Sequence, residues 1–408
     1  AFITVDPEGA IRSAEAADKA TRRGDQVGPL NGVPISIKDL EATSGLRTTY
    51  GSIIYRDLVP DKDSVVAERI RQSGAVILGK TNTPEFGNRE ETFTGIYPAC
   101  NNPWDVSRIP GGSSGGAAAS IASGMCAIGT GTDGGGSVRF PAAMCGIFGH
   151  KPTQGLVPRA GGVAQPATNQ TSTSGPMSRT VRDSALMLNI LAGHDARDPG
   201  SLRTPVPDYL SDLESGVKGM KIGLSLDMGF AAIEPEIGDA VNNAAKVFES
   251  LGAHVEETDI ALNPPPREYW WTIWCGNQKA MYGDLEENHA EQLMPYTLGM
   301  IRHGATVSAA DYSRSLRLAD QLRLQMAEFY DRFDLLLLPC TAVSAWRHRE
   351  PPTTIGSRDT GSSAGEKIGS ELAGITYGAI PVTMAFNISW NPAASIPCGF
   401  DSLGLPIG

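Results

Sequence analysis

Two glycine-rich segments that carry serines are the part of this sequence best suited to chemistry. One runs from Pro110 to Gly116 and reads Pro-Gly-Gly-Ser-Ser-Gly-Gly; the other runs from Gly131 to Arg139 and reads Gly-Thr-Asp-Gly-Gly-Gly-Ser-Val-Arg. Glycine takes backbone angles that other residues avoid, and it lets the chain approach a ligand closely. Because Ser137 follows three glycines, several amide N–H groups can converge beside its hydroxyl, as an oxyanion hole requires. The pattern indicates a nucleophilic serine set among amide donors.

Other chemistries that use glycine-rich loops fit these segments less well. Neither segment has the Gly-Lys-Ser/Thr ending of a phosphate-binding loop, and no acidic residue follows at the distance that a dinucleotide fold requires. Residues 111–115 satisfy the loose G-x-S-x-G pattern of a nucleophile elbow, but no apolar strand precedes them. A Ser–His–Asp hydrolase also needs a committed histidine, and none of the six histidines lies in a motif. A histidine-dependent α/β-hydrolase therefore remains only as an alternative.

A base that could activate the serine without histidine is Lys38. Residues 33–40 alternate Val33, Ile35 and Ile37 with other residues, which is the period of a strand, so Lys38 points to the face opposite the isoleucines. A buried lysine loses its charge readily, and the neutral amine is a competent general base. A solvated surface lysine is the alternative, and the residues alone favour it.

The surrounding pattern alternates strands and helices. A strand at 33–40, a helix over 65–73 capped by Ser64, and a buried strand at 75–79 predict a parallel crossover unit. Further expected elements are a buried helix at 117–124, strands at 125–129, 220–225 and 334–338, a helix at 235–251, a helical segment at 267–332 and a long loop at 344–366. The helical segment is rich in tryptophan, and it either walls a substrate pocket or forms an ordinary outer layer.

Composition and charge narrow the class of protein. The chain has 408 residues, 41% of them hydrophobic, and a net charge of −11, which argues against nucleic acid and anionic membranes as main partners. The six cysteines form no CxxC pair and indicate buried thiols in a reducing cytoplasm. No apolar run approaches the ~18 residues of a transmembrane helix. Because the chain lacks an initiator Met and stops in a strand-like segment, we expect residues to be missing at both ends.

Taken together, the motifs resemble the amidase signature family. The similarity is carried by residues 111–142, 32–39, 79–87, 102–105, 149–153 and 175–179. It is close over about 30–185 and looser elsewhere. It implies one domain over residues 1–408, in which 30–185 form the signature core and 267–332 a helical insertion near the substrate pocket. The implied fold is a three-layer α/β/α arrangement around a central, mostly parallel mixed sheet.

The resemblance also implies a mechanism, that of a serine amidohydrolase without a metal or other cofactor. By motif, Ser137 is the nucleophile that forms an acyl-enzyme, Ser113 is the serine that follows a cis peptide bond, and Lys38 is the base. The N–H groups of Ser137 and of the preceding glycines form the oxyanion hole, namely Gly134, Gly135 and Gly136. Supporting or substrate-binding positions are implied at Gly87, Ser114, Thr132, Asp133, Arg139 and Gln170.

The substrate is less constrained than the chemistry. The family includes the glutamine-hydrolysing subunit of tRNA amidotransferases, which carries an acidic residue where this chain has Ser172. An amino-acid ammonium would lack its counter-charge here, so we expect a stand-alone enzyme, monomeric or homodimeric. The uncharged segment 160–174 and Trp270 to Trp274 favour small aryl or alkyl amides, with carbamates (urethanes) and esters as further options. The amidotransferase subunit remains the alternative.

Overall fold

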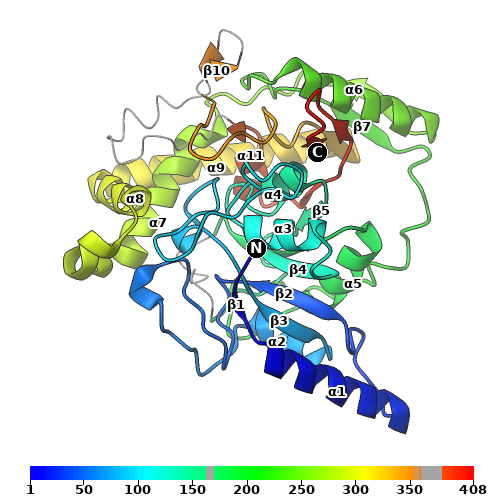
Figure 1. Ribbon diagram of the computed structural model, residues 1–408. Helices are drawn as coiled ribbons and strands as arrows, with labels where there is room; N and C mark the ends of the chain where they lie inside the picture. The colour runs from blue at the N-terminus through cyan, green and yellow to red at the C-terminus, as the bar shows by residue number, and fades with distance from the viewer. Residues whose placement is uncertain (162–169, 353, 356–357, 360–378) are drawn as a thin grey trace.

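A seven-stranded mixed sheet lies at the centre of the protein (Figure 1). A computed structural model describes residues 1–161, 170–352, 354–355, 358–359 and 379–408. The order across the sheet is β1-β3-β2-β4-β6-β5-β12. Its strands are β1 (Phe2–Val5), β2 (Pro34–Lys38), β3 (Val76–Thr81), β4 (Ile128–Asp133), β5 (Phe148–Lys151), β6 (Thr173–Ser178) and β12 (Ala393–Ser395).

The directions of these strands correct one expectation. Strand β2 pairs in parallel with both β3 and β4, as the predicted crossover requires. The other four pairings in this sheet, β1–β3, β4–β6, β5–β6 and β5–β12, are antiparallel. The sheet is therefore mixed as predicted, but it is not mostly parallel. The antiparallel half could not be read from the sequence because single strands carry no signal of direction.

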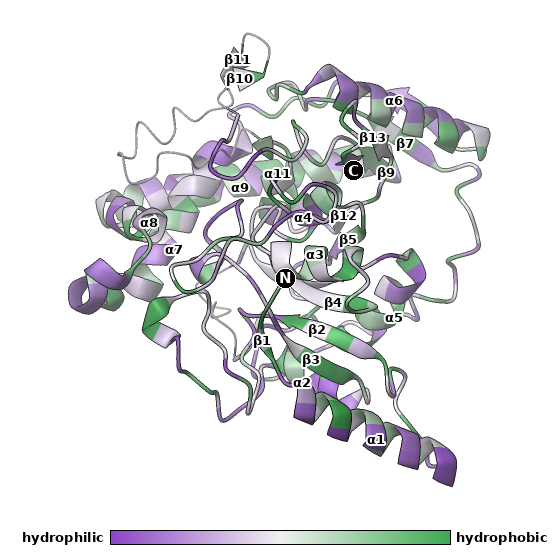
Figure 2. Cartoon of the chain, viewed as in Figure 1, coloured by the Kyte–Doolittle hydropathy of each residue, from purple (hydrophilic) through white to green (hydrophobic). Residues whose placement is uncertain are grey.

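Helices cover both faces of the sheet and give the predicted three layers. On one face α2 (Val65–Gln72) and α5 (Val181–Leu191) pack on Ile35 and Ile37. On the other face α3 (Gly115–Ala122) and α4 (Arg139–Cys145) form a second apolar cluster. In Figure 2 strands β2 and β3 carry hydrophobic residues, and the outer helix α1 (Pro7–Arg23) is mainly hydrophilic with hydrophobic residues between the polar ones.

Strand β2 places Lys38 as the alternation predicted. Ile35 and Ile37 face α2 and α5, while Ser36 lies on the side of α3, with its Oγ 3.5 Å from Ser120 Oγ. Lys38 shares the face of Ser36, yet its side chain is fully buried. The surface-lysine alternative is therefore wrong.

A smaller parallel sheet follows in the second half of the chain. Its order is β8-β7-β9, with β7 (Lys221–Leu224), β8 (His254–Glu257) and β9 (Leu335–Leu337), and α6 (Pro235–Ser250) connects the first two. The predicted strand at 334–338 exists, but Leu335 is 41% exposed, so this strand is not buried. The predicted strand at 125–129 begins only at Ile128, because Gly124 ends α3 in a left-handed turn (φ 72°).

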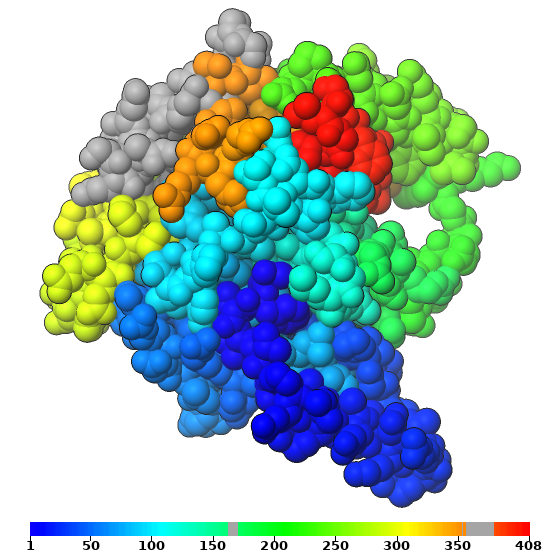
Figure 3. Space-filling view, in the orientation of Figure 1, coloured from blue at the N-terminus to red at the C-terminus, as the bar shows by residue number. Residues whose placement is uncertain are grey.

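The helical segment predicted at 267–332 is confirmed. It consists of α7 (Pro266–His289), α8 (Pro295–Thr306) and α9 (Ala309–Tyr330), and its apolar side packs on α4 and on α11 (Thr383–Ile388). Short elements complete the described chain: η1 (Ile53–Tyr55), η2 (Glu85–Gly87), η3 (Ala290–Gln292), β10 (Thr354–Ile355), β11 (Arg358–Asp359), β13 (Gly399–Phe400) and β14 (Pro406–Ile407). The C-terminal residues lie beside the segment that contains α4, and α1 projects from the body (Figure 3).

The uncharged segment 160–174 and the predicted loop at 344–366 are each described only in part. The structure does not describe residues 162–169 of the 160–174 segment, nor residues 353, 356–357 and 360–366 of the predicted loop at 344–366. Thr173 and Ser174 already belong to β6. No helix in the described ranges is both long and apolar enough to cross a membrane.

Candidate active site

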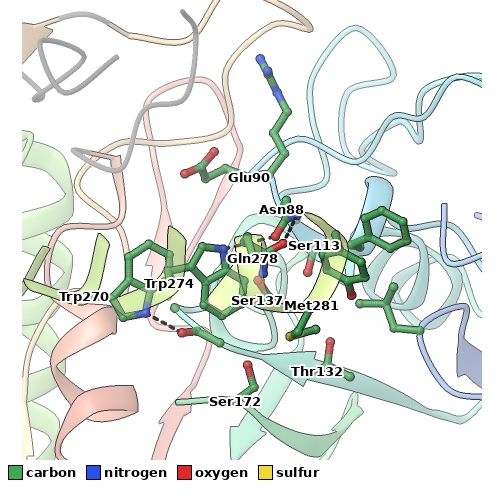
Figure 4. Close-up of a pocket in the computed structure, with 18 of the residues that line it drawn as sticks. Asn88, Glu90, Ser113, Thr132, Ser137, Ser172, Trp270, Trp274, Gln278 and Met281 are labelled. Atoms are coloured by element: carbon green, nitrogen blue, oxygen red, sulfur yellow. Dashed lines mark hydrogen bonds between the residues drawn. The ribbon is translucent and has the colours of Figure 1, made fainter. Parts of the chain in front are cut away.

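A cavity lies between the central sheet and helix α7, and both glycine-rich segments reach it (Figure 4). The first segment contributes Ser113, the second contributes Ser137, and α7 contributes the opposite wall. The lining comprises Leu40, Phe86, Gly87, Asn88, Arg89, Glu90, Gly112, Ser113, Thr132, Gly134, Gly135, Ser137, Arg159, Ser172, Trp270, Trp274, Gln278, Met281, Tyr282 and Ile380. Ser113 and Ser137 are 24 positions apart in the sequence, and the fold brings their two segments to one site.

Lys38 reaches this site from the end of β2. Its Nζ lies 2.8 Å from Ser113 Oγ, 2.8 Å from Ser114 Oγ and 2.9 Å from Thr132 Oγ1. The carbonyl oxygen of Thr132 lies 3.4 Å away. Ser114 and Thr132 also bond to each other, since the Thr132 N–H donates to Ser114 Oγ at 3.3 Å. A short polar network therefore fixes the amine beside Ser113.

The surroundings of Lys38 favour its neutral form. Burial lowers the pKa of Lys38 well below its ordinary value of 10.5; nearby Asp133 and Glu41 oppose this shift, and Arg159 adds to it. An ammonium has three N–H donors and no acceptor, whereas the neutral amine has a lone pair. Neutral Lys38 can therefore accept the Ser113 hydroxyl proton while it donates to Thr132.

The main chain ties the two serine segments together. The Gly112–Ser113 peptide bond is cis, as the resemblance implied. The amide of Ser114 donates to the carbonyl oxygen of Ser137 at 3.2 Å, directly after Ser113. Ser137 is half-buried and lines the same cavity as Ser113.

The glycines before Ser137 are held by their carbonyl oxygens. Trp270 Nε1 donates to Gly134 O at 2.8 Å, and Thr383 Oγ1 donates to Gly135 O at 2.5 Å. Among the described residues, the N–H groups of Gly134, Gly135 and Ser137 have no acceptor. These three donors are thus free to meet an oxyanion.

Gly136 corrects the predicted set of donors. Its N–H donates to Asp133 Oδ1 at 2.8 Å, so it is already used inside the loop. Gly136 has a backbone φ of +138°, an angle that residues other than glycine rarely adopt. We therefore assign Gly136 to the shape of the loop rather than to the oxyanion hole.

A buried ion pair fixes the same loop from behind. Arg139 Nη2 lies 2.9 Å from Asp133 Oδ1, and Arg139 Nε donates to Asp133 Oδ2 at 2.9 Å. Asn387 Nδ2 also donates to Asp133 Oδ1, at 2.9 Å. Burial alone would raise the Asp133 pKa, but the charge and hydrogen bonds of Arg139 hold the pKa of this carboxyl well below its usual value. Asp133 and Arg139 therefore support the loop without facing the cavity.

Replacing Arg139 by Met is expected to destabilise the fold, because it leaves the Asp133 carboxylate buried without its partner. Breaking a buried pair in this way costs about 3–5 kcal/mol of the free energy of unfolding. Urea unfolding of Arg139→Met measures this loss. The control is Arg197→Met, which removes a half-exposed guanidinium that pairs with both Glu68 and Asp195 and is expected to cost about 1 kcal/mol or less for each pair. Equal losses in the two variants would argue against the supporting role of Arg139.

Two further predicted site residues are Gly87 and Gln170, and only Gly87 lines the cavity. Gly87 lines it at φ +77°, with Ser113 Oγ 3.2 Å from where a Cβ would stand. Gln170 does not line the cavity in the part of the chain that the structure describes, and its substrate-binding role stays a prediction. It is exposed, it is not part of the lining, and its carbonyl oxygen accepts from Trp390 Nε1 at 2.9 Å.

Trp270 and Trp274, from the tryptophan-rich segment expected to wall a pocket, line the cavity, whereas the sequence analysis did not single out Asn88 and Gln278. Trp270 and Trp274 stack with ring centroids 5.1 Å apart, and Trp274 Nε1 donates to Asn88 Oδ1 at 3.2 Å. Asn88 Nδ2 donates in turn to Gln278 Oε1 at 2.7 Å. The spacing of 270, 274 and 278 is that of one helix face, so helical periodicity could have found Gln278. Asn88 carries no such signal.

The described residues give no support to two other site types. No histidine lines the cavity, and no three His, Cys, Asp or Glu side chains in the described ranges could together hold a metal ion. The pattern GxxxxGK[ST] does occur once, from Gly74 to Thr81, but most of it forms strand β3, and Lys80 is buried against Thr43 and Thr48. It is therefore not a phosphate-binding loop.

Comparison with known proteins gives consistent matches over the whole chain. The family model described as "Amidase" matches residues 1–408. A glutamyl-tRNA(Gln) amidotransferase subunit of Alkaliphilus metalliredigens (strain QYMF) is 34% identical over 433 aligned residues, covering 100% of this chain and 84% of that protein.

Solved structures resemble the fold closely. A bacterial aryl acylamidase of the amidase signature family superposes with a TM-score of 0.89 at 33% identity, covering 100% of this chain and 84% of that one. A glutamyl-tRNA(Gln) amidotransferase subunit of Thermotoga maritima superposes with a TM-score of 0.78 at 29% identity, covering 99% of this chain and 87% of that one.

Proposed function

Because this chain belongs to the amidase signature family, we propose that it is a stand-alone serine amidohydrolase of small amides. Its substrates would be aryl or alkyl amides, with carbamates and esters cleaved through the same carbonyl chemistry. The observation that carries this proposal is the contact of 2.8 Å between Lys38 Nζ and Ser113 Oγ, at the edge of a cavity that also contains Ser137.

The contact between Lys38 and Ser113 supports the first step of a proton path, which we propose continues to Ser137 in the same cavity. Neutral Lys38 takes the Ser113 hydroxyl proton, and Ser113 takes the proton of Ser137 as its oxygen attacks the amide carbonyl carbon. The resulting oxyanion meets the N–H groups of Gly134, Gly135 and Ser137. As the C–N bond breaks, the proton returns through Ser113 to the leaving amine. Water then repeats the sequence on the acyl-enzyme and releases the acid.

Two alternatives carry less support. The histidine-dependent hydrolase lacks a histidine at the cavity, and the His194–Ser201 contact lies outside its lining. The glutamine-hydrolysing role is favoured by the identity to amidotransferase sequences. However, Ser172, a neutral residue, lines the cavity at the position where the resemblance implies an acidic one. An enzyme that acts without partner proteins fits this difference better.

The rate is expected to rise with pH if Lys38 is the base. The active form carries neutral Lys38, whose share grows as pH rises through the Lys38 pKa in the folded protein. Because burial lowers this pKa, kcat/KM should rise with pH and reach its plateau in the range below about pH 10, where an ordinary lysine still carries its charge. Initial rates with an uncharged 4-nitroanilide measure the profile. A rate that falls over this range would contradict the assignment.

A substrate panel tests the proposed function. The purified chain is assayed with a 4-nitroanilide, the matching 4-nitrophenyl ester, an aryl carbamate and glutamine. Turnover of the anilide or carbamate without turnover of glutamine is the expected result. Hydrolysis of glutamine alone would instead favour the amidotransferase role.

Two further features follow from this proposal. All three residues of the relay come from one chain, so we propose a monomer or homodimer with a small-molecule substrate and no required partner. The six cysteines are unpaired and five are buried, which supports a cytoplasmic location.

A further inference from the structure

A buried carboxyl group in the cavity has no role in the proton relay. Glu90 lines the cavity and is only 3% exposed, and its Oε1 has no hydrogen-bond partner among the described residues. Its main chain packs against Gly112, where an added Cβ would lie 2.7 Å from the Glu90 carbonyl carbon. Figure 4 shows the Glu90 side chain at the periphery of the drawn residues, with its carboxyl group directed away from the labelled Ser113 and Ser137. The main chain of Glu90 thus lies against the residue that precedes Ser113.

Two charged residues flank Glu90 in the sequence. Arg89 is the neighbouring cation, and its guanidinium lies over the rings of Phe93 (4.9 Å) and Tyr296 (5.5 Å). The other nearby carboxyl, Glu91, accepts from Trp346 Nε1 at 3.0 Å. Burial raises the pKa of Glu90 to about 7, Glu91 adds to the shift, and the Glu90 backbone N–H and Arg89 oppose it. At pH 8 most of the Glu90 side chains carry a negative charge.

A buried carboxylate oxygen without a partner is costly, so its presence in a cavity calls for an explanation such as a water, an ion or a ligand that completes it. A cation with N–H donors is the ligand that restores both the hydrogen bond and the charge balance. We propose that Glu90 binds a protonated amine of the substrate. This inference rests on the proposed function and narrows its substrate class to amides or carbamates that carry a second, cationic amino group.

The position of this group explains the neutral residue at Ser172. The resemblance places the counter-charge for a substrate ammonium at that position in the glutamine-hydrolysing relatives. Here Ser172 and Glu90 both line the cavity, and Glu90 comes from the segment after Gly87. A substrate amine would therefore be held from a different wall, beside Asn88.

Paired substrates that differ in one amino group test this inference. On the acyl side, 4-nitroanilides of ω-amino acids of increasing chain length are compared with those of the matching alkanoic acids. On the leaving side, N-acetyl-4-(aminomethyl)aniline is compared with N-acetyl-4-ethylaniline. At pH 8 the wild type is expected to favour the cationic member of at least one pair by about tenfold or more in kcat/KM.

Glu90→Gln should bring this ratio close to one, because the amide keeps the shape and loses the charge. Glu91→Gln is the matched control, since Glu91 is the next residue and does not line the cavity, and it should keep the ratio. No preference in the wild type, or a preference that survives in Glu90→Gln, would overturn the inference. Hydrolysis of the uncharged members, and its loss in Ser137→Ala, reports separately on the proposed function.

Discussion

Replacing Ser137 by Ala is expected to lower kcat for an uncharged 4-nitroanilide by about 10⁴-fold or more. Without the hydroxyl no acyl-enzyme forms, and only the oxyanion donors and substrate binding remain. Ser137 is half-buried at the cavity, so the variant should fold normally. Steady-state rates, together with an unchanged thermal unfolding midpoint, measure the effect.

The control for this variant is Ser172→Ala. Ser172 is a second serine in the cavity lining, but it makes no contact with Lys38, Ser113 or Ser114 through its hydroxyl among the described residues. Its loss is expected to change kcat by about tenfold or less. If Ser137→Ala kept more than a tenth of wild-type turnover, another group would have to be the nucleophile.

Replacing Lys38 by Met is expected to lower kcat/KM by about 10³-fold. Methionine fills much of the same space but cannot accept a proton from Ser113, and general-base catalysis contributes about 10²–10⁴-fold. The residual activity should also lose its rise with pH, which a purely structural role of Lys38 would not remove. The measurement is the pH profile of kcat/KM for both proteins.

Lys80→Met is the control for the loss of a buried lysine. Lys80 lies beside Ile37 on the neighbouring strand, is equally buried, and donates to Thr43 and Thr48 instead of a cavity serine. The folded fraction of this variant should keep the pH-dependent rise. An equal loss of activity and of pH dependence in both variants would contradict a specific role for Lys38.

The local elements of the first half could be predicted because their patterns are strong. Alternation placed Lys38 on the face opposite Ile35 and Ile37, and Ser64 caps α2 through the amide of Ala67 at 3.2 Å. What alternation alone could not give was burial. The sequence alone favours a surface position for Lys38. In the structure, the start of α3 and strand β4 bring Ser114 and Thr132 to its amine.

The parts that failed have no marker in the sequence. The antiparallel β4–β6 pairing joins distant segments, and the use of the Gly136 N–H by Asp133 depends on the backbone angles of one short loop. Glu90 and Asn88 lie in an irregular segment, where no periodicity marks the residues that face a cavity. The triad was accessible from sequence only through the resemblance of its motifs, and the walls of the pocket required the fold.

Trapping the covalent intermediate tests the central claim most directly. The protein is mixed with a 4-nitrophenyl carbamate, whose carbamoyl-enzyme hydrolyses slowly, and then quenched for intact-mass and peptide mass spectrometry. We expect one carbamoyl group per chain, on Ser137, and none in Ser137→Ala. Stoichiometric release of 4-nitrophenol with the adduct on Ser113 or on another residue would contradict the assignment of Ser137 as the nucleophile.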